Sequence, residues 1–137
     1  MSATAESKPL TRATSADFKR LLKLTDQCSS EIAAFARKYE GRNVAFDGSI
    51  VAMNNYDDDS TRFNILLNAG DFSATKAIPG PNFQFRNVNV TYDLKLTGPN
   101  IPDTIGVGQN LRVLARVNTY VSNQCLFLLD PVSTQVR

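Results

Sequence analysis

Two ten-residue segments of this chain share one pattern, which restricts the fold more than any other feature. Residues 41–50 (GRNVAFDGSI) and 108–117 (GQNLRVLARV) both begin with glycine, have asparagine third and then alternate apolar residues with others. Apolar residues at every second position predict a strand with one buried face. A small residue inside such a strand, here Gly48 or Ala115, indicates a bend. Two curved strands of this kind predict a small β-barrel.

A helical lead precedes the first of these strands. Ser15 is a suitable N-cap for a helix whose apolar stripe lies within residues 18–22. A second helix is expected to begin near Ser29 or Ser30 and to stop at Gly41, because glycine commonly ends helices. The chain therefore predicts a helical pair before the sheet.

The alternation of apolar residues places the remaining strands. We expect strands over residues 43–53, 62–69, 83–96, 111–117 and 124–129. The alternation slips once, between Phe85 and Val88, which predicts a bulge or bend. Residues 1–14 are polar and predict a flexible linker, and residues 15–137 predict a single domain. The expected fold class is α+β, an antiparallel barrel of about five strands with an N-terminal helical lead.

Composition excludes several classes of function. The 137 residues are 42% hydrophobic and 20% charged, which is typical of a globular domain. Histidine is absent, so the chain lacks a His-based catalytic triad and a His-containing metal site. The net charge of +2 is too small to indicate a nucleic-acid-binding or membrane-surface domain. We therefore expect no enzyme activity, no cofactor and no metal site.

The acidic run Asp57-Asp58-Asp59 is the one motif that suggests a metal ion. Carboxylates in a loop suit calcium, but the run lacks the alternating ligands and the distant glutamate of an EF-hand. A solvated hairpin loop is the favoured interpretation.

The order of helices and strands resembles the OB-fold, and more narrowly the bacterial OB-like domains related to transfer-RNA-anticodon-binding modules. The first strand of that group has the form of residues 41–50, and its late strand follows a glycine turn like residues 106–108. The segment 125–130 resembles its closing strand. The resemblance covers residues 30–130 and implies an OB-like barrel.

Five longer strings are similar to a bacterial domain family of unknown function. They are RFNIL (62–66), AGDF (69–72), GPNFQFRNVN (80–89), IPDTIGVG (101–108) and DPVST (130–134). This resemblance covers nearly all of the chain after residue 15 and implies a module of anchored or secreted proteins. It implies an extracytoplasmic location with an anchor upstream, although the sequence itself contains no span of about 20 apolar residues.

The two cysteines lie far apart in the sequence but are suited to meet. Helical spacing places Cys28 at the start of the buried stripe of the second helix, and Cys125 shares strand parity with Phe127 and Leu129. A disulfide would then staple the helix to the last strand. The alternative is two unpaired buried thiols that act as small hydrophobes. The export implied by the family favours the disulfide.

Aromatic and basic residues on two strands suggest a ligand-facing surface. Phe83 and Phe85 share one face and are expected in the core, which directs Gln84 and Arg86 outward. Candidate residues elsewhere extend a basic strip, namely Arg62, Arg112 and Arg116. Such a strip beside aromatic residues would suit single-stranded nucleic acid.

The tripeptide Gly-Pro-Asn occurs at residues 80–82 and again at 98–100. Glycine and proline before asparagine usually mark a turn. Rigid loops at one end of a barrel also form docking sites, so Asn82 and Asn100 are further candidates for ligand contact. The sequence as a whole predicts a non-catalytic extracytoplasmic module that binds an unknown protein or small ligand. A weak single-stranded nucleic-acid binder is the alternative.

Overall fold

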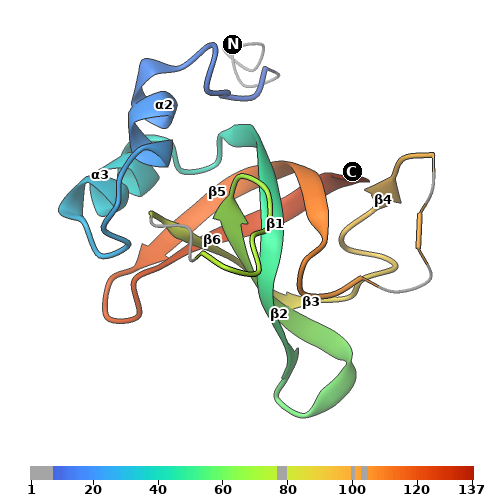
Figure 1. Ribbon diagram of the computed structural model, residues 1–137. Coiled ribbons are helices and arrows are strands. Elements are labelled where there is room, and N and C mark those ends of the chain that lie inside the picture. The colour runs from blue at the N-terminus through green and yellow to red at the C-terminus, as the bar shows by residue number, and fades with distance from the viewer. Residues whose placement is uncertain (1–7, 77–79, 100, 103–104) are drawn as a thin grey trace.

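The computed structural model of the protein describes residues 8–76, 80–99, 101–102 and 105–137. Two short helices lead into a six-stranded sheet (Figure 1). The elements are α2 (Ala16–Leu22), α3 (Ser30–Lys38), β1 (Asn43–Tyr56), β2 (Asp59–Ala69), β3 (Asn82–Val88), β4 (Leu96–Thr97), β5 (Asn110–Val121) and β6 (Leu126–Val136).

The sheet closes on itself as a five-stranded barrel. The strand order is β3-β2-β1-β5-β6-β4, and a parallel pairing of β3 with β6 joins the two ends of the barrel. The other barrel pairings are antiparallel, and the two-residue β4 adds to β6 outside the closed circuit. The predicted α+β class, with a barrel of five strands after a helical lead, is confirmed.

The two segments with the shared pattern lie side by side as antiparallel β1 and β5. Asn43 pairs with Arg116 and Ser49 pairs with Asn110. Both pattern glycines have positive φ, and each donates its N–H to the far end of the other segment. Gly41 donates to the Val117 carbonyl, and Gly108 to the Ile50 carbonyl. The repeat in the sequence is therefore a local two-fold symmetry of one strand pair.

Phenylalanine rings join the helices to the barrel interior. Ser15 and Ser29 cap α2 and α3, as the sequence predicted within one residue, and the buried faces of the two helices contribute Phe18 and Phe35. These rings form a closed circuit of contacts with three barrel rings, at centroid separations of 4.8–6.1 Å. The barrel members are Phe46, Phe83 and Phe127. The helices thus share the core of the barrel.

The strand predicted over residues 83–96 is shorter than expected. β3 ends at Val88, with a register shift against β2 and a positive φ at Asn87 that account for the slip in the alternation. Beyond it, Asn89 Oδ1 accepts hydrogen bonds from the N–H groups of Thr91 and Tyr92 and forms a turn. Val90 and Leu94 pack on the core from this loop, and the period-2 spacing of apolar residues does not distinguish such a loop from a strand.

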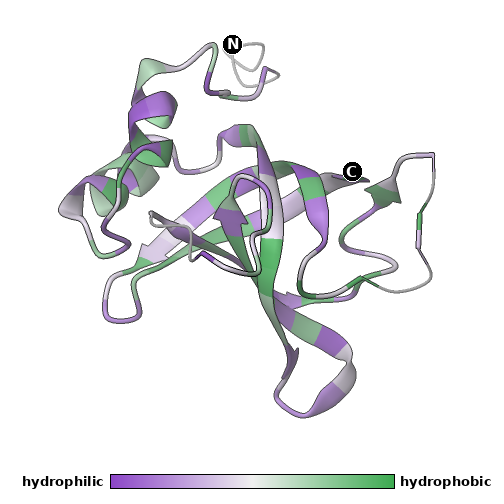
Figure 2. Cartoon of the chain, viewed as in Figure 1, coloured by the Kyte–Doolittle hydropathy of each residue, from purple (hydrophilic) through white to green (hydrophobic). Residues whose placement is uncertain are grey.

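The β1–β2 hairpin is longer than predicted and projects beyond the barrel (Figure 1). Asp57 and Asp58 form its tight turn, both with positive φ. The Asp59 carboxylate accepts hydrogen bonds from the N–H and hydroxyl of Thr61, which lowers the pKa of Asp59. Figure 2 shows that the projecting end is mostly hydrophilic.

The described part of the N-terminal segment, which the sequence predicts to be a linker, contacts β1 at Leu10. Leu10 forms a parallel bridge with Val44, donating its N–H to the Asn43 carbonyl and accepting from the N–H of Ala45. The side chains of Thr11 and Thr14 then bond to each other and to their backbone N–H groups. Two backbone hydrogen bonds therefore hold Leu10 against β1, and residues 11–14 form a local turn.

Candidate functional site

A hollow of about 480 Å³ lies over the outer face of three barrel strands. Its floor is formed by Val51 of β1, Asn68 of β2 and Asn82 of β3. Asn68 is buried, and its Nδ2 donates a hydrogen bond of 2.9 Å to Asn82 Oδ1. The loop after β2 forms one wall and Gln27, from the α2–α3 connection, lies at another edge. The hollow is therefore built from four separate parts of the chain.

The wall after β2 is held in place from both sides. The N–H of Phe72 donates to Asn110 Oδ1 at 2.8 Å, and the Phe72 ring lies within van der Waals distance of the position that a Cβ on Gly108 would occupy. Ser73 Oγ accepts from the N–H groups of Thr75 and Lys76 at 3.3 and 3.1 Å. Asn110 is the asparagine of the second pattern segment, so this recurring residue has a defined role in the wall.

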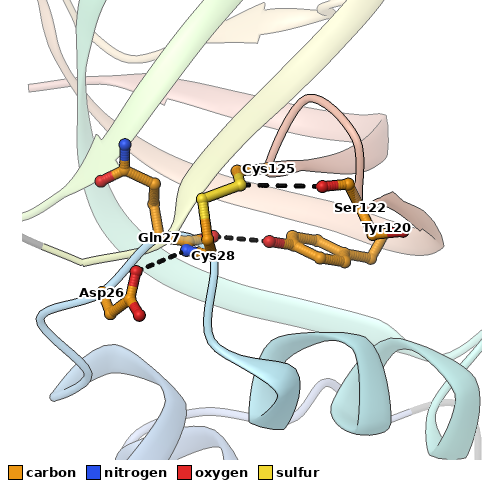
Figure 3. Close-up of a disulfide and its surroundings, with 6 residues drawn as sticks. All are labelled: Asp26, Gln27, Cys28, Tyr120, Ser122 and Cys125. Carbon is orange, nitrogen blue, oxygen red and sulfur yellow. Dashed lines mark hydrogen bonds between the residues drawn. A yellow bond between two sulfur atoms is a disulfide. The ribbon is translucent and has the colours of Figure 1, made fainter.

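A disulfide fixes the opposite edge, where Gln27 lies (Figure 3). Cys28 and Cys125 are joined, with their Cα atoms 4.9 Å apart and 97 positions separating them in the sequence. Beside the disulfide, the Tyr120 hydroxyl donates to the Gln27 carbonyl at 2.6 Å. Burial raises the pKa of Tyr120 above its ordinary value. These two links hold the α2–α3 connection against the β5–β6 turn.

The predicted cysteine pairing is confirmed, but its expected place in the core is wrong. Cys28 is exposed and precedes Ser29, the N-cap of α3, so it does not belong to the apolar stripe of that helix. Cys125 has a positive φ and lies in the turn before β6. Side chains alternate between the two faces only within a strand. Because Cys125 lies in a turn, the prediction that its side chain faces the core was wrong.

Gly80 brings the end of the β2–β3 connection close to the same edge. Its φ is +127°, and a Cβ at this position would lie 2.7 Å from the Leu24 carbonyl oxygen. Only glycine fits both the backbone conformation and the approach. The Gly-Pro-Asn turn at 80–82 therefore places Asn82 at the start of β3 while its glycine packs against the α2–α3 connection.

Two other hollows are less suited to a ligand because their charges pair internally. One lies between α2 and α3, where Asp17 accepts from Lys38 and Tyr39. The other, about 790 Å³, lies beside α2 and β1, where Arg112 pairs with Asp47 at 3.3 Å. The hollow over β1–β3 instead has amides and hydroxyls, with Lys76 as the titratable side chain among the described residues that line it.

The structure brings three of the predicted ligand-facing residues together on β3. Phe83 and Phe85 are fully buried as predicted. Arg86 lies on the outer face, where its guanidinium donates to Gln84 Oε1 at 2.9 Å and to Gln124 Oε1 at 3.0 Å. Asn82, in the hollow, begins the same strand. The contact of these residues with a ligand stays a prediction.

The predicted basic strip is neutralised by neighbouring carboxylates. Arg112 pairs with Asp47, and Arg116 Nη2 lies 3.7 Å from Asp130. Arg62 likewise pairs with an acidic residue, Asp93, at 3.1 Å. Neither Arg112 nor Arg116 lines the hollow. The last candidate, Asn100, lies outside the described residues.

Sequence reasoning missed most residues of the hollow. Asn68 lies at an outward position of β2, where an asparagine ordinarily faces solvent, and it is buried only because a loop folds over it. Phe72, Ser73 and Thr75 lie in a segment that the sequence marks only as a loop. No local signal distinguishes these residues, because the hollow is formed by contacts between distant segments.

Two further features concern the described part of the chain. It contains no cluster of three or more potential metal-ligating side chains. None of its helices has the length and apolar character needed to cross a membrane.

Comparison with known proteins identifies a family for the chain. A family model described as a domain of unknown function (DUF4839) matches residues 13–137. No curated protein and no solved structure matches the chain.

Proposed function

The chain belongs to the DUF4839 family, and we propose that it is a non-catalytic extracytoplasmic binding module that holds a ligand in the hollow over β1, β2 and β3. The observation that carries this proposal is the amide-rich floor of the hollow. A buried asparagine joined to a second asparagine, beneath a pinned loop, is a preorganised polar surface rather than a solvated one.

The topology of the barrel also supports a binding site on the face over β1, β2 and β3. We infer an OB-like barrel, because five strands close through β1-β2-β3-β6-β5. OB-folds bind their ligands on the face of the second and third strands. Asn68 and Asn82 belong to the second and third strands of this barrel. The fold alone does not select a ligand, since this barrel carries many functions.

The chemistry of the hollow favours binding over catalysis. The described residues that line it include no carboxylate, and the chain has no histidine. A general base suited to neutral pH is therefore missing from this surface. The hydroxyls of Ser73 and Thr75 have no such base beside them among these residues.

The extracytoplasmic location rests on the disulfide. Disulfides persist in oxidising compartments and are rare in reducing ones. The link between Cys28 and Cys125 lies at an exposed edge, where cytosolic reductants would reach it. Non-reducing mass spectrometry of the protein taken from its native cells tests this part: an intact disulfide is expected, and two free thiols would contradict the location.

The binding proposal is tested by nuclear magnetic resonance on the oxidised, isotope-labelled protein. Three probe classes are titrated separately: neutral oligosaccharides, short uncharged peptides and a ten-residue thymidine oligonucleotide at low and high salt. We expect a neutral probe to shift the amide signals of Asn68, Ser73 and Asn82. A titration in which no class perturbs these signals would contradict the proposal.

Single-stranded nucleic acid is the alternative ligand. Arg62, Arg112 and Arg116 would have to leave their carboxylate partners to bind phosphate. Salt-sensitive oligonucleotide binding that Arg112→Ala together with Arg116→Ala abolishes would support this alternative.

A further inference from the structure

One arginine on the face beside the hollow is held by neutral amides and not by a carboxylate. Arg86 is exposed on β3, and its guanidinium donates from Nε to Gln84 Oε1 at 2.9 Å and from Nη2 to Gln124 Oε1 at 3.0 Å. The other arginines of the strands each pair with a carboxylate, namely Arg62 with Asp93, Arg112 with Asp47 and Arg116 with Asp130. Arg86 has no carboxylate partner among the described residues, so none of them neutralises its positive charge.

The bond to Gln124 directs this guanidinium toward the hollow. Gln124 lies in the turn before β6, directly before the disulfide-bonded Cys125. The parallel pairing of β3 with β6 places Asn82 opposite Leu126, which is two residues after Gln124. The Arg86 side chain is therefore turned back along β3, toward the end of the strand at which Asn82 lines the hollow.

The guanidinium keeps donors for a ligand while both glutamines stay bound. The glutamine bonds involve Nε and Nη2, whereas Nη1 donates to none of the described residues. A carboxylate forms charge-assisted hydrogen bonds with such a group, which are stronger than those between neutral partners. Because both glutamine oxygens are neutral, they do not repel an approaching anion as a carboxylate partner would.

We propose that Arg86 binds the C-terminal carboxylate of a peptide whose uncharged body lies in the hollow; the inference rests on the proposed function of the hollow. One guanidinium among neutral amides balances one negative charge. An uncharged peptide ends in a single carboxylate, whereas a nucleic acid or an acidic polysaccharide repeats its charge along the chain and needs a row of unpaired cations. The strand arginines that would extend such a row are already paired.

The hollow suits the rest of such a peptide. Amides, hydroxyls and apolar side chains line it, and the described lining residues include no carboxylate. Asn82 and Arg86 are four residues apart on β3, which is about 13 Å along the strand. An extended tetrapeptide covers this length, so its body can lie over Asn82 while its carboxylate meets Arg86.

The probe is an equimolar library of acetylated tetrapeptides of uncharged residues, prepared with a free C-terminal carboxylate and again as the C-terminal amide. Ultrafiltration with the oxidised protein and mass spectrometry identify the retained peptides, and isothermal titration calorimetry gives the affinity of the best one in both forms. We expect the carboxylate form to bind at least about tenfold more tightly, because the amide loses the charged hydrogen bond to Arg86. Its titration should shift the Arg86 Nε–H resonance together with the backbone amide of Asn82.

Two substitutions at exposed positions localise the carboxylate. Arg86→Gln removes the cation and should weaken binding of the carboxylate form at least about tenfold, whereas Arg116→Gln removes a cation that already faces Asp130 and should not. Gln124→Glu keeps the shape of the side chain but places a carboxylate against Arg86, and should weaken binding by a similar factor. Asn54→Asp adds the same charge on the exposed hairpin and should leave the affinity unchanged. Thermal melts check that each variant folds.

The outcomes separate this inference from the proposed function. Equal affinity for the carboxylate and amide forms, or a neutral oligosaccharide that binds the hollow while neither peptide form does, overturns the role of Arg86 and leaves the binding module intact. Carboxylate-dependent binding that Arg86→Gln and Gln124→Glu do not reduce places the carboxylate elsewhere and also overturns it. No binding by any probe class overturns both.

Discussion

At the scale of single residues, a few side chains and one glycine set the geometry of the candidate site. Gly80 shows this most clearly. Its φ is positive, and a Cβ at this position would lie 2.7 Å from the Leu24 carbonyl oxygen. Backbone cannot move aside as a flexible side chain can. The position therefore determines how the β2–β3 connection meets the α2–α3 connection.

We predict that Gly80→Ala lowers the free energy of unfolding by about 1–3 kcal/mol, the usual cost of a strained backbone conformation. Chemical denaturation measures it. Gly106→Ala is the matched control, because among the described residues no atom beyond its chain neighbours lies within 4 Å of its Cβ position, and it should be neutral or slightly stabilising. Equal effects of the two substitutions would contradict the role of Gly80.

Asp17 is a second residue whose hydrogen bonds fix local geometry. Its carboxylate accepts hydrogen bonds from the Tyr39 hydroxyl at 2.5 Å and from Lys38 Nζ at 2.9 Å, and these lower the pKa of Asp17 below its ordinary value of 3.8. The same hydrogen bond raises the pKa of Tyr39. The carboxylate thus ties α2 to the end of α3.

A carboxylate whose pKa is lower in the folded state than in the unfolded state stabilises the fold at pH values above its ordinary pKa. That contribution is lost as the pH falls through the pKa of the folded state. We predict that Asp17→Asn lowers the melting temperature at pH 7 and that the difference from the unsubstituted protein shrinks below pH 3.8. Thermal melts from pH 7 to pH 2 measure it. A difference independent of pH would show that the charge is not responsible.

At the scale of elements, the disulfide and Tyr120 join the helical lead to the β5–β6 turn. The sequence indicated this pairing through residue spacing, yet the actual contact lies at the edge of the hollow and not in the core. The elements were predictable because capping residues and apolar periodicity are local. The contacts between these elements were not predictable, because the periodicity that indicates where a side chain points is interrupted at turns.

We predict that Cys28→Ser with Cys125→Ser lowers the free energy of unfolding by roughly 4–5 kcal/mol, since a loop of almost a hundred residues is no longer closed in the unfolded chain. Urea denaturation measures it. Unsubstituted protein in dithiothreitol should match the variant. A decrease in the free energy of unfolding of less than about 1 kcal/mol would contradict this prediction. It would indicate that the segments around Cys28 and Cys125 stay close in the unfolded chain without the disulfide.

At the scale of the whole molecule, helices and barrel share one core. Phe127 contacts both Phe35 of α3 and Phe83 of β3, and it is 1% exposed. A shared core of this size favours one cooperative unfolding transition. The binding that we propose would involve side chains on the outer face of this barrel.

We predict that Phe127→Ala lowers the free energy of unfolding by about 3–5 kcal/mol, the cost of removing a buried phenylalanine ring. Far-ultraviolet and near-ultraviolet dichroism should still report a single transition. Tyr92→Ala is the control, because Tyr92 is 77% exposed and its removal should change little. Separate transitions of helices and sheet would contradict a shared core.

The sequence by itself determined the two helices and the approximate places of the five barrel strands, and only the tertiary structure decided the strand ends and the candidate site. The paired pattern of residues 41–50 and 108–117 predicted two strands, and the structure makes them neighbours with glycines at matching ends. Alternation reports which face of a strand meets the core, because burial follows the pleat. It does not report what covers the other face. Asn68 and Asn82 lie in a candidate site only because the loop after β2, the disulfide-linked α2–α3 connection and the barrel strands meet around them.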